Sequence, residues 1–223
     1  MKVLITGGNG DIAQAIAQLL REKEHSVLTP SHEVLNVTND FEVRTYIIRN
    51  KPDVIINNAG IINPQNIVIA GDSGTNMADD ICWEDQILVN LVGTYLCSKY
   101  GLISGAKQII NIGSSAGAKG KAGWSAYCAA KAGVERLTES LHAEGHYATC
   151  LRIGRTKTSM RRELFGEEDP DTLMHPMDVA VWVPEIMDNP KLYSGCILDI
   201  NKLSNEIWVG TDTCIPTTGN TKC

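Results

Sequence analysis

Tyr127 and Lys131 are a pair of residues whose types and spacing could support proton-transfer chemistry. They are four positions apart in a segment with helical periodicity, so both side chains project from one face, about one turn apart. A tyrosine hydroxyl has a pKa of about 10 in water, and a nearby ammonium lowers this pKa by stabilising the phenolate. Such a pair can exchange a proton with a substrate oxygen. The spacing also fits an aromatic core residue beside a solvated lysine.

Further polar residues follow two segments that we expect to be strands, at 53–57 and 108–112. Open parallel sheets bind ligands at the carboxyl ends of their strands. Ser114 lies just past the second strand, where its hydroxyl could hydrogen-bond a reacting oxygen or simply stabilise a turn. At the end of the first strand, the asparagine amides can brace the sheet and the small residues leave space for a cofactor. This first run consists of Asn57, Asn58, Ala59 and Gly60.

A glycine-rich turn follows the expected strand at 2–6. Gly7, Gly10 and Ala13 fit the pattern G-x-x-G-x-x-A, and apolar residues recur at helical spacing from Ile12 onward. Small residues at these positions permit a tight turn, let the backbone approach a pyrophosphate and allow the helix to pack closely on the sheet. The N–H groups and dipole of the helix start favour phosphate. The turn therefore predicts a dinucleotide site.

The strand expected at 26–29 ends without the carboxylate that commonly hydrogen-bonds the ribose of NAD. The following residues include Ser31 and His32, and no carboxylate occurs before Glu33. Ser31 and His32 could contact a 2′-phosphate, although no arginine or lysine stands beside them. The absence of this carboxylate slightly favours NADP(H) over NAD(H) as the cofactor.

The elements that must position these residues alternate regularly between short apolar strands and amphipathic helices. Strands that are apolar throughout indicate a parallel sheet covered on both faces, beginning with a right-handed βαβαβ unit. A segment at 61–80 has no clear period and is expected to form a long loop. We expect strands at 2–6, 26–29, 53–57, 108–112, 148–153 and 195–200, and helices at about 12–20, 39–50, 83–104, 125–144 and 178–187.

Composition restricts the class of protein further. The 223 residues, 43% hydrophobic and 21% charged, predict one globular domain at 1–210 with a peripheral polar tail at 211–223. No run approaches the ~20 apolar residues of a membrane span, and the apolar start is interrupted early, so we expect a cytoplasmic protein without membrane partners. Seven scattered cysteines without a CxxC pair predict neither a disulfide framework nor a metal site. The net charge of −6 argues against nucleic-acid binding.

Taken together, five segments resemble the short-chain dehydrogenase/reductase family, in the family's order and spacing, over residues 1 to about 200. Any one of these segments is modest evidence, whereas five in register are specific. The resemblance implies a Rossmann-type doubly wound parallel sheet with helices on both faces. The segments are TGGNGDIA from Thr6, NNAG from Asn57, NLVG from Asn90, NIGSSAG from Asn111 and YCAAK from Tyr127.

In that family a tyrosine exchanges a proton with the substrate oxygen while hydride passes to or from the nicotinamide, and the resemblance assigns this role to Tyr127. Lys131 would bind the nicotinamide ribose and lower the tyrosine pKa. Ser114 would orient the substrate carbonyl or alcohol, with Ser115 as the neighbouring alternative. Asn90 matches the asparagine that supports a proton-relay water.

The resemblance also assigns cofactor contacts. Asn36 falls where the family usually has an adenine-contacting aspartate. Thr158 keeps the place that contacts the nicotinamide carboxamide, although Ile153 replaces the proline that usually opens this turn, and the usual glycine pair is absent at Asn201-Lys202. The expected cofactor contacts are Gly7, Asn9, Gly10, Asp11, Ile12, Ser31, Asn36, Val37, Asn58, Ala59, Gly60, Tyr127, Lys131 and Thr158.

The expected partner is a small carbonyl or alcohol substrate, but the loops at 61–80 and 155–175 that would select it contain no motif that identifies it. Four cations in the second loop could clamp a carboxylate or phosphate, or could form a solvated charged face. The family resemblance adds a homodimer or homotetramer assembled through a helix bundle. The four cations are Arg155, Lys157, Arg161 and Arg162.

The sequence as a whole predicts an NAD(P)(H)-dependent oxidoreductase that interconverts a carbonyl and an alcohol by hydride transfer. Two alternatives stay open. A non-catalytic nucleotide-binding regulatory protein of the same fold would account for Ile153 and the missing glycine pair. A nucleotide-sugar reductase or epimerase would account for the TGGNG opening and for Leu35 to Asn39, although such proteins typically have longer chains.

Overall fold

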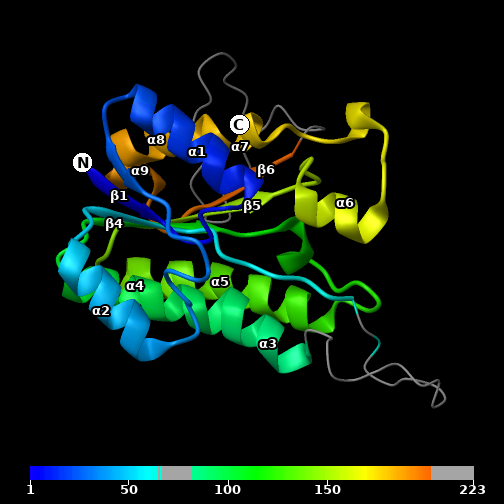
Figure 1. Ribbon diagram of the computed structural model, residues 1–223, viewed down its shortest axis with the longest axis horizontal. Coiled ribbons are helices and arrows are strands. Elements are labelled where there is room, and N and C mark those ends of the chain that lie inside the picture. The colour runs from blue at the N-terminus through cyan, green and yellow to red at the C-terminus, as the bar shows by residue number, and fades with distance from the viewer. Residues whose placement is uncertain (65, 67–81, 202–223) are drawn as a thin grey trace.

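Short apolar runs form the strands of a parallel sheet in the computed structural model, which describes residues 1–64, 66 and 82–201 (Figure 1). The strand order is β2-β1-β3-β4-β5-β6, and every neighbouring pair is parallel. Because β1 lies between β2 and β3, the winding reverses there, and the carboxyl ends of β1 and β3 flank the switch point. The strands are β1 Lys2–Ile5, β2 Ser26–Leu28, β3 Val54–Asn57, β4 Gln108–Ile112, β5 Ala148–Ile153 and β6 Ile197–Ile200.

Helices cover both faces of the sheet, which confirms the predicted doubly wound architecture (Figure 1). One face carries α1 Asp11–Glu22, α7 Pro176–Ala180, α8 Trp182–Asp188 and α9 Pro190–Tyr193. The other face carries α2 Asp40–Asn50, α3 Trp83–Ile87, η1 Leu88–Val92, α4 Gly93–Ile103 and α5 Ser125–Ala143. Beyond the carboxyl ends of the strands lie η2 Ser115–Gly117 and α6 Ser159–Phe165, and η3 Pro170–Thr172 follows in the chain.

The core divides according to the alternation of side chains along each strand. Val3 and Ile5 pack in the cluster on the α1 and α7 face, whereas Leu4 between them packs in the cluster on the α2 and α4 face. In β3, Ile55 and Ile56 are divided between the two faces in the same way. Because both faces of the sheet are buried, apolar residues occur on both sides of the strands, which is why the sequence shows no regular alternation of apolar and polar residues.

Two predicted helices are interrupted. The helix expected at 83–104 consists of α3 and α4 joined by the π-helical turn η1. The helix expected at 178–187 is divided at Val181 between α7 and α8. Pro184 provides the reason for the second break, because proline has no N–H to bond the carbonyl of Ala180 and its ring clashes with that carbonyl.

The segment predicted as an irregular loop at 155–175 contains a helix, α6. Thr158 caps its start, accepting a hydrogen bond from the Arg161 N–H at 3.2 Å. Gly166, at φ +70°, ends it. A threonine and a glycine eight positions apart are recognisable helix boundary signals, so the sequence contained this information.

Part of the predicted organisation falls outside the described residues, namely 65 and 67–80 of the 61–80 loop, 202–210 of the predicted domain and the whole tail at 211–223. The division into a 1–210 domain and a tail therefore stays a prediction. Within the described ranges, no helix is long and apolar enough to cross a membrane. The cytoplasmic location remains a prediction.

Candidate active site

A cavity of about 940 Å³ lies along the carboxyl edge of the sheet. Its walls come from the glycine turn after β1, the ends of β3, β4 and β5, the first turns of α5, and α6. The cavity therefore lies beside the switch point between β1 and β3, where open α/β sheets bind ligands.

The glycine turn lines one end of this cavity together with Asn9, Asp11 and Ile12. Gly7 has φ +65°, and a Cβ there would lie 2.8 Å from the Cα of Ala59. A Cβ on Gly8 would overlap the carbonyl of Thr29. Any larger residue at these two positions would strain the turn or push β2 and β3 away, so the turn depends on glycine.

The N-terminus of α1 opens next to this turn. Gly10 provides no side-chain cap for the helix, so no side chain of the N-cap residue occupies its first N–H groups. The Asp11 carboxylate instead accepts a hydrogen bond from the Ser159 N–H at 2.8 Å and so links α1 to α6. This arrangement of small residues and helix start suits the phosphates of a dinucleotide.

The end of β3 is fixed to the glycine turn by side-chain hydrogen bonds. Asn58 Nδ2 donates to the carbonyls of Thr6 at 3.1 Å and Gly7 at 3.3 Å. Thr6 Oγ1 accepts from the N–H groups of Asn58 and Ala59 at 3.1 and 3.0 Å. Asn58, Ala59 and Gly60 all line the cavity, so the asparagine both braces the two strands and contributes to the wall.

Ser114, Tyr127 and Lys131 line the same cavity. Lys131 is 5% exposed, and its Nζ donates to the Ile112 carbonyl at 2.9 Å while lying 5.6 Å from the centroid of the Tyr127 ring. Ser114 occupies the start of η2, where its Oγ accepts from the Ala116 N–H at 3.2 Å. The helix spacing of the pair and the position of the serine after β4 thus bring three proton-carrying groups together.

Burial dominates the proton affinities of this group. The pKa of Tyr127 is raised by loss of solvent, and a hydrogen bond from Ser114, which favours the phenolate, offsets this only in part. Burial lowers the pKa of Lys131 to about 8. The pKa of Tyr127 therefore lies above its ordinary value with no resolved effect of Lys131, and the expected lowering of this pKa by the lysine stays a prediction.

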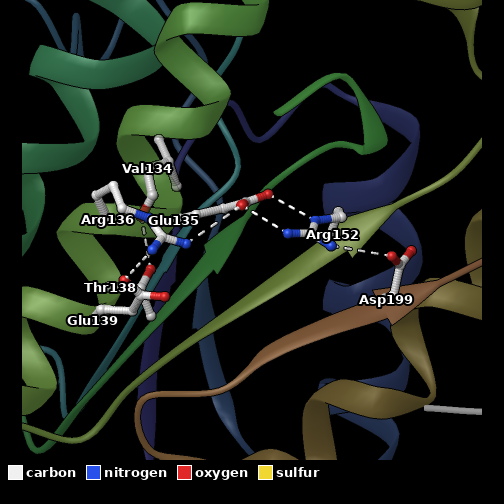
Figure 2. A network of polar contacts seen from close by, with 7 residues as sticks. All are labelled: Val134, Glu135, Arg136, Thr138, Glu139, Arg152 and Asp199. Carbon is white, nitrogen blue, oxygen red and sulfur yellow. Dashed lines mark hydrogen bonds and ion pairs between the residues drawn. The ribbon is translucent and has the colours of Figure 1, made fainter. Parts of the chain in front are cut away.

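An ion-pair network connects the helix of this pair to the sheet (Figure 2). Glu135, one turn beyond Lys131 on α5, is 3% exposed and accepts two hydrogen bonds of 2.8 Å from Arg152 on β5. Arg152 also donates to Asp199 on β6 at 3.2 Å. The hydrogen bonds to Glu135, and to a smaller extent the contact with Asp199, raise the pKa of Arg152 further, so the guanidinium stays charged. The network fixes α5, and with it Tyr127, over the strand ends.

Asn90 does not line the cavity with the other predicted catalytic residues. It is fully buried in η1, where its Nδ2 donates to the carbonyls of Ile61 and Gln86 at 2.7 and 2.8 Å and its Oδ1 accepts from the Ile61 N–H at 3.2 Å. Its own carbonyl accepts from Thr94 Oγ1 at 2.9 Å. The side chain therefore holds the chain that leaves β3, and a role with a relay water stays a prediction.

Three predicted cofactor residues also lie away from the cavity wall. Asn36 Oδ1 accepts from both the N–H and the hydroxyl of Thr38, at 3.0 and 2.8 Å, so this amide stabilises a local turn. Val37 is buried, and its side chain packs against Gly93. Ser31 hydrogen-bonds Glu33 and lowers the pKa of that carboxyl. His32 and the ionised Glu33 form the wall here instead of Ser31.

Thr158 also lines the cavity, and the structure adds lining residues that the sequence analysis did not single out. Trp124 stacks on Phe165, with ring centroids 5.9 Å apart, and makes an edge contact of 5.8 Å with the Tyr127 ring. Of the four cations predicted in the 155–175 loop, Arg155 and Arg161 line the cavity, whereas Lys157 and Arg162 are exposed outside it. Phe165 is far from Trp124 in sequence, so no local pattern could indicate the contact between these two rings.

Comparison with known proteins agrees with this fold. Residues 42–169, more than half of the chain, match the family described as short chain dehydrogenase, and residues 1–65 match the model described as RmlD substrate binding domain. The chain belongs to the short-chain dehydrogenase/reductase family.

Relatives and solved structures extend this comparison. The 3-oxoacyl-(acyl-carrier-protein) reductase of Vibrio harveyi is 32% identical over 201 residues, covering 76% of this chain and 79% of the relative. The protein of that name from Haemophilus influenzae is 34% identical over 168 residues, covering 63% of this chain and 66%, just under two thirds, of the relative. A Burkholderia thailandensis oxidoreductase of the family shares the fold, with a TM-score of 0.72, 20% identity and coverage of 90% and 91%.

Proposed function

We propose that this protein is an NAD(P)(H)-dependent oxidoreductase that interconverts a carbonyl and an alcohol. One observation carries the proposal: Ser114, Tyr127 and Lys131 line the same cavity as the glycine turn after β1. The two relatives described above are named as reductases, which supports the same class of reaction.

The cavity fits a dinucleotide on structural grounds. Side chains are absent at Gly7, Gly8 and Gly10, and α1 begins there without a side-chain cap. These backbone groups would hold the pyrophosphate, and Asn58 to Gly60 would lie along the rest of the cofactor. When bound, the cofactor supplies or accepts a hydride.

The chain's own residues would handle the proton. Because burial keeps Tyr127 protonated at neutral pH, its hydroxyl can donate a proton to the substrate oxygen as a carbonyl is reduced. Ser114 would hydrogen-bond the same oxygen and orient it. The Lys131 ammonium, 5.6 Å from the Tyr127 ring, would stabilise the phenolate left behind.

Replacement of Tyr127 by Phe tests this mechanism. We expect kcat to fall by about 10²- to 10⁴-fold, because the general acid is lost, while the Kd for the cofactor changes far less. The assay is a panel of aldehydes, ketones and keto acids with NADH and NADPH. The control Tyr147→Phe removes a tyrosine hydroxyl at an exposed position outside the cavity and should retain full activity. Full activity in Tyr127→Phe would show that another group transfers the proton.

The choice of cofactor depends on the wall formed by His32 and Glu33. We propose NADP(H), because no carboxylate ends β2, and we expect Glu33 to weaken this preference by repelling a 2′-phosphate. Glu33→Gln should then tighten NADPH binding relative to NADH, as measured by calorimetric titration of both proteins with both cofactors. An unchanged ratio of the two Kd values would place Glu33 away from the ribose.

A second candidate is reduction or epimerisation of a nucleotide-linked sugar. The match of residues 1–65 to the RmlD substrate binding domain specifically favours it. A nucleoside-diphosphate keto sugar therefore belongs in the same substrate panel, and turnover of that compound alone would favour this candidate. Tight cofactor binding without turnover of any compound would instead indicate the non-catalytic regulatory protein.

We propose that the protein assembles as a homodimer through α3 to α4, where the family resemblance places an interface. Large apolar side chains are exposed along these helices, namely Trp83, Leu88, Tyr95 and Ile103. Sedimentation equilibrium of the purified protein would measure the oligomeric state, and a monomer at micromolar concentration would contradict the proposal.

A further inference from the structure

Part of the cavity lining consists of aromatic rings and charged side chains in mutual contact, which we call the aromatic–cation wall: Lys121, Trp124, Arg155, Arg161, Phe165 and Glu168. Lys121 Nζ lies 3.5 Å from the Trp124 ring centroid and 5.1 Å from that of Phe165. Arg161 Cζ lies 4.6 Å from the Phe165 centroid. The wall thus combines flat apolar surfaces with positive charge.

The aromatic–cation wall contains more positive than negative charge. Arg161 donates two hydrogen bonds to Glu168, at 2.6 and 2.8 Å, so this carboxylate is paired most closely with Arg161. The charges of Arg155 and Lys121 also lower the pKa of Glu168, so the three cations of the wall share its single carboxylate. The pKa of Lys121 is lowered, first by burial and then by repulsion from Arg161 and Arg155, so these cations act on one another.

The wall adjoins the proposed proton donor. The Trp124 ring meets the Tyr127 ring edge to face, with centroids 5.8 Å apart and planes at 83°. A ligand group against Lys121 and Trp124 would therefore be close to the substrate position at Tyr127. The phosphates of a dinucleotide would lie against the glycine turn, whose residues are other members of the cavity lining.

We propose that the substrate carries, besides its reacting carbonyl or alcohol, an oxyanion bound by Lys121 and Arg155, and a flat apolar part that packs on Trp124 and Phe165. This inference rests on the proposed function and narrows it to anionic substrates, either carboxylates or phosphates. An added negative charge offsets the excess positive charge of the wall, and arginine and lysine both bind carboxylate and phosphate oxygens.

Calorimetry on the protein saturated with oxidised cofactor tests the binding without requiring turnover. The probes are phenylacetate, phenyl phosphate and the neutral phenylacetamide. We expect at least one anion to bind about tenfold or more tightly than the amide, and Lys121→Met to remove most of that difference, because a hydrogen bond to a charged group is lost. Lys191→Gln removes the same charge from exposed α9, away from the cavity, and should leave the difference unchanged.

A second measurement compares turnover of 2-oxo-4-phenylbutanoate with that of its methyl ester. The ratio of kcat/KM for acid over ester should exceed ten in the wild type and fall at least tenfold in Lys121→Met. Equal binding of phenylacetamide and both anions, or an acid preference that survives Lys121→Met, would overturn the anion site. Anion-selective binding that depends on Lys121, without turnover of any carbonyl, would support the site and overturn the oxidoreductase activity instead.

Discussion

The buried ion pair between Glu135 and Arg152 allows a quantitative test of what holds α5 over the active site (Figure 2). In Glu135→Gln the guanidinium loses its charged partner, although it keeps Asp199 at 3.2 Å. Breaking a buried pair by removing one partner costs about 3–5 kcal/mol, and we expect about 3 kcal/mol because Arg152 is 21% exposed. The midpoint of thermal unfolding should then fall by about 6–12 °C, at about 2–4 °C per kcal/mol for a chain of this size.

The assay is thermal and urea unfolding of the wild type, Glu135→Gln and a control on the same helix. The control is Glu139→Gln, which breaks an ion pair of 2.7 Å to Arg136, whose side chain is 66% exposed. That pair is solvated, so its loss should cost less than about 0.5 kcal/mol. If the Glu135 variant is no less stable than the control, the network does not hold α5 in place and the reasoning fails.

A double substitution separates the pair from its surroundings. Replacing both Glu135 and Arg152 by methionine removes both buried charges, so the double variant should be more stable than the sum of the two single losses predicts. Additive losses would mean that the two side chains contribute independently, and the contact between α5 and β5 would then depend on packing alone.

Two further outcomes are expected. Gly7→Ala should weaken cofactor binding by about tenfold or more, because a Cβ 2.8 Å from the Cα of Ala59 and a φ of +65° together force the turn to move. Calorimetric titration with the cofactor would measure this loss. An unchanged Kd would exclude the turn from the cofactor site. Because burial lowers the pKa of Lys131 to about 8, its ammonium is lost as pH rises through about 8, so kcat/KM for carbonyl reduction should decline there. Lys131→Met should have a lower kcat/KM at every pH and should not show the decline near pH 8. A decline at the same pH in that variant would assign the titration to another group.

Much of the scaffold could be predicted because its determinants are local. Mainly apolar runs predicted β4 and β5 with their observed bounds, since a strand buried on both faces carries apolar residues on both of its sides. The spacing of Tyr127 and Lys131 predicted that they share a helix face near the sheet edge, and both line the cavity. The break between α7 and α8 was missed although Pro184 was visible, because apolar periodicity continued across it.

Residue roles were harder to predict, because a side chain's hydrogen bonds depend on what the fold places beside it. The turn η1 directs the Asn90 amide to Ile61, a contact that the sequence did not predict, and the catalytic role of Asn90 stays a prediction. Asn36 bonds Thr38 two positions away, and its contact with the cofactor also stays a prediction. A motif specifies the type of residue at a position, whereas its partners come from distant parts of the chain.

The sequence by itself determined the order of elements, the parallel sheet and the positions of the glycine turn and the tyrosine–lysine pair, since each depends on the periodicity or spacing of neighbouring residues. Only the tertiary structure decided which charges share a wall of the cavity. Lys121 and Phe165 are separated by more than forty positions and meet because α6 packs across the carboxyl edge of the sheet. Electrostatic and aromatic contacts act over a few ångströms of space regardless of distance along the chain, so no reading of the sequence alone could place them together.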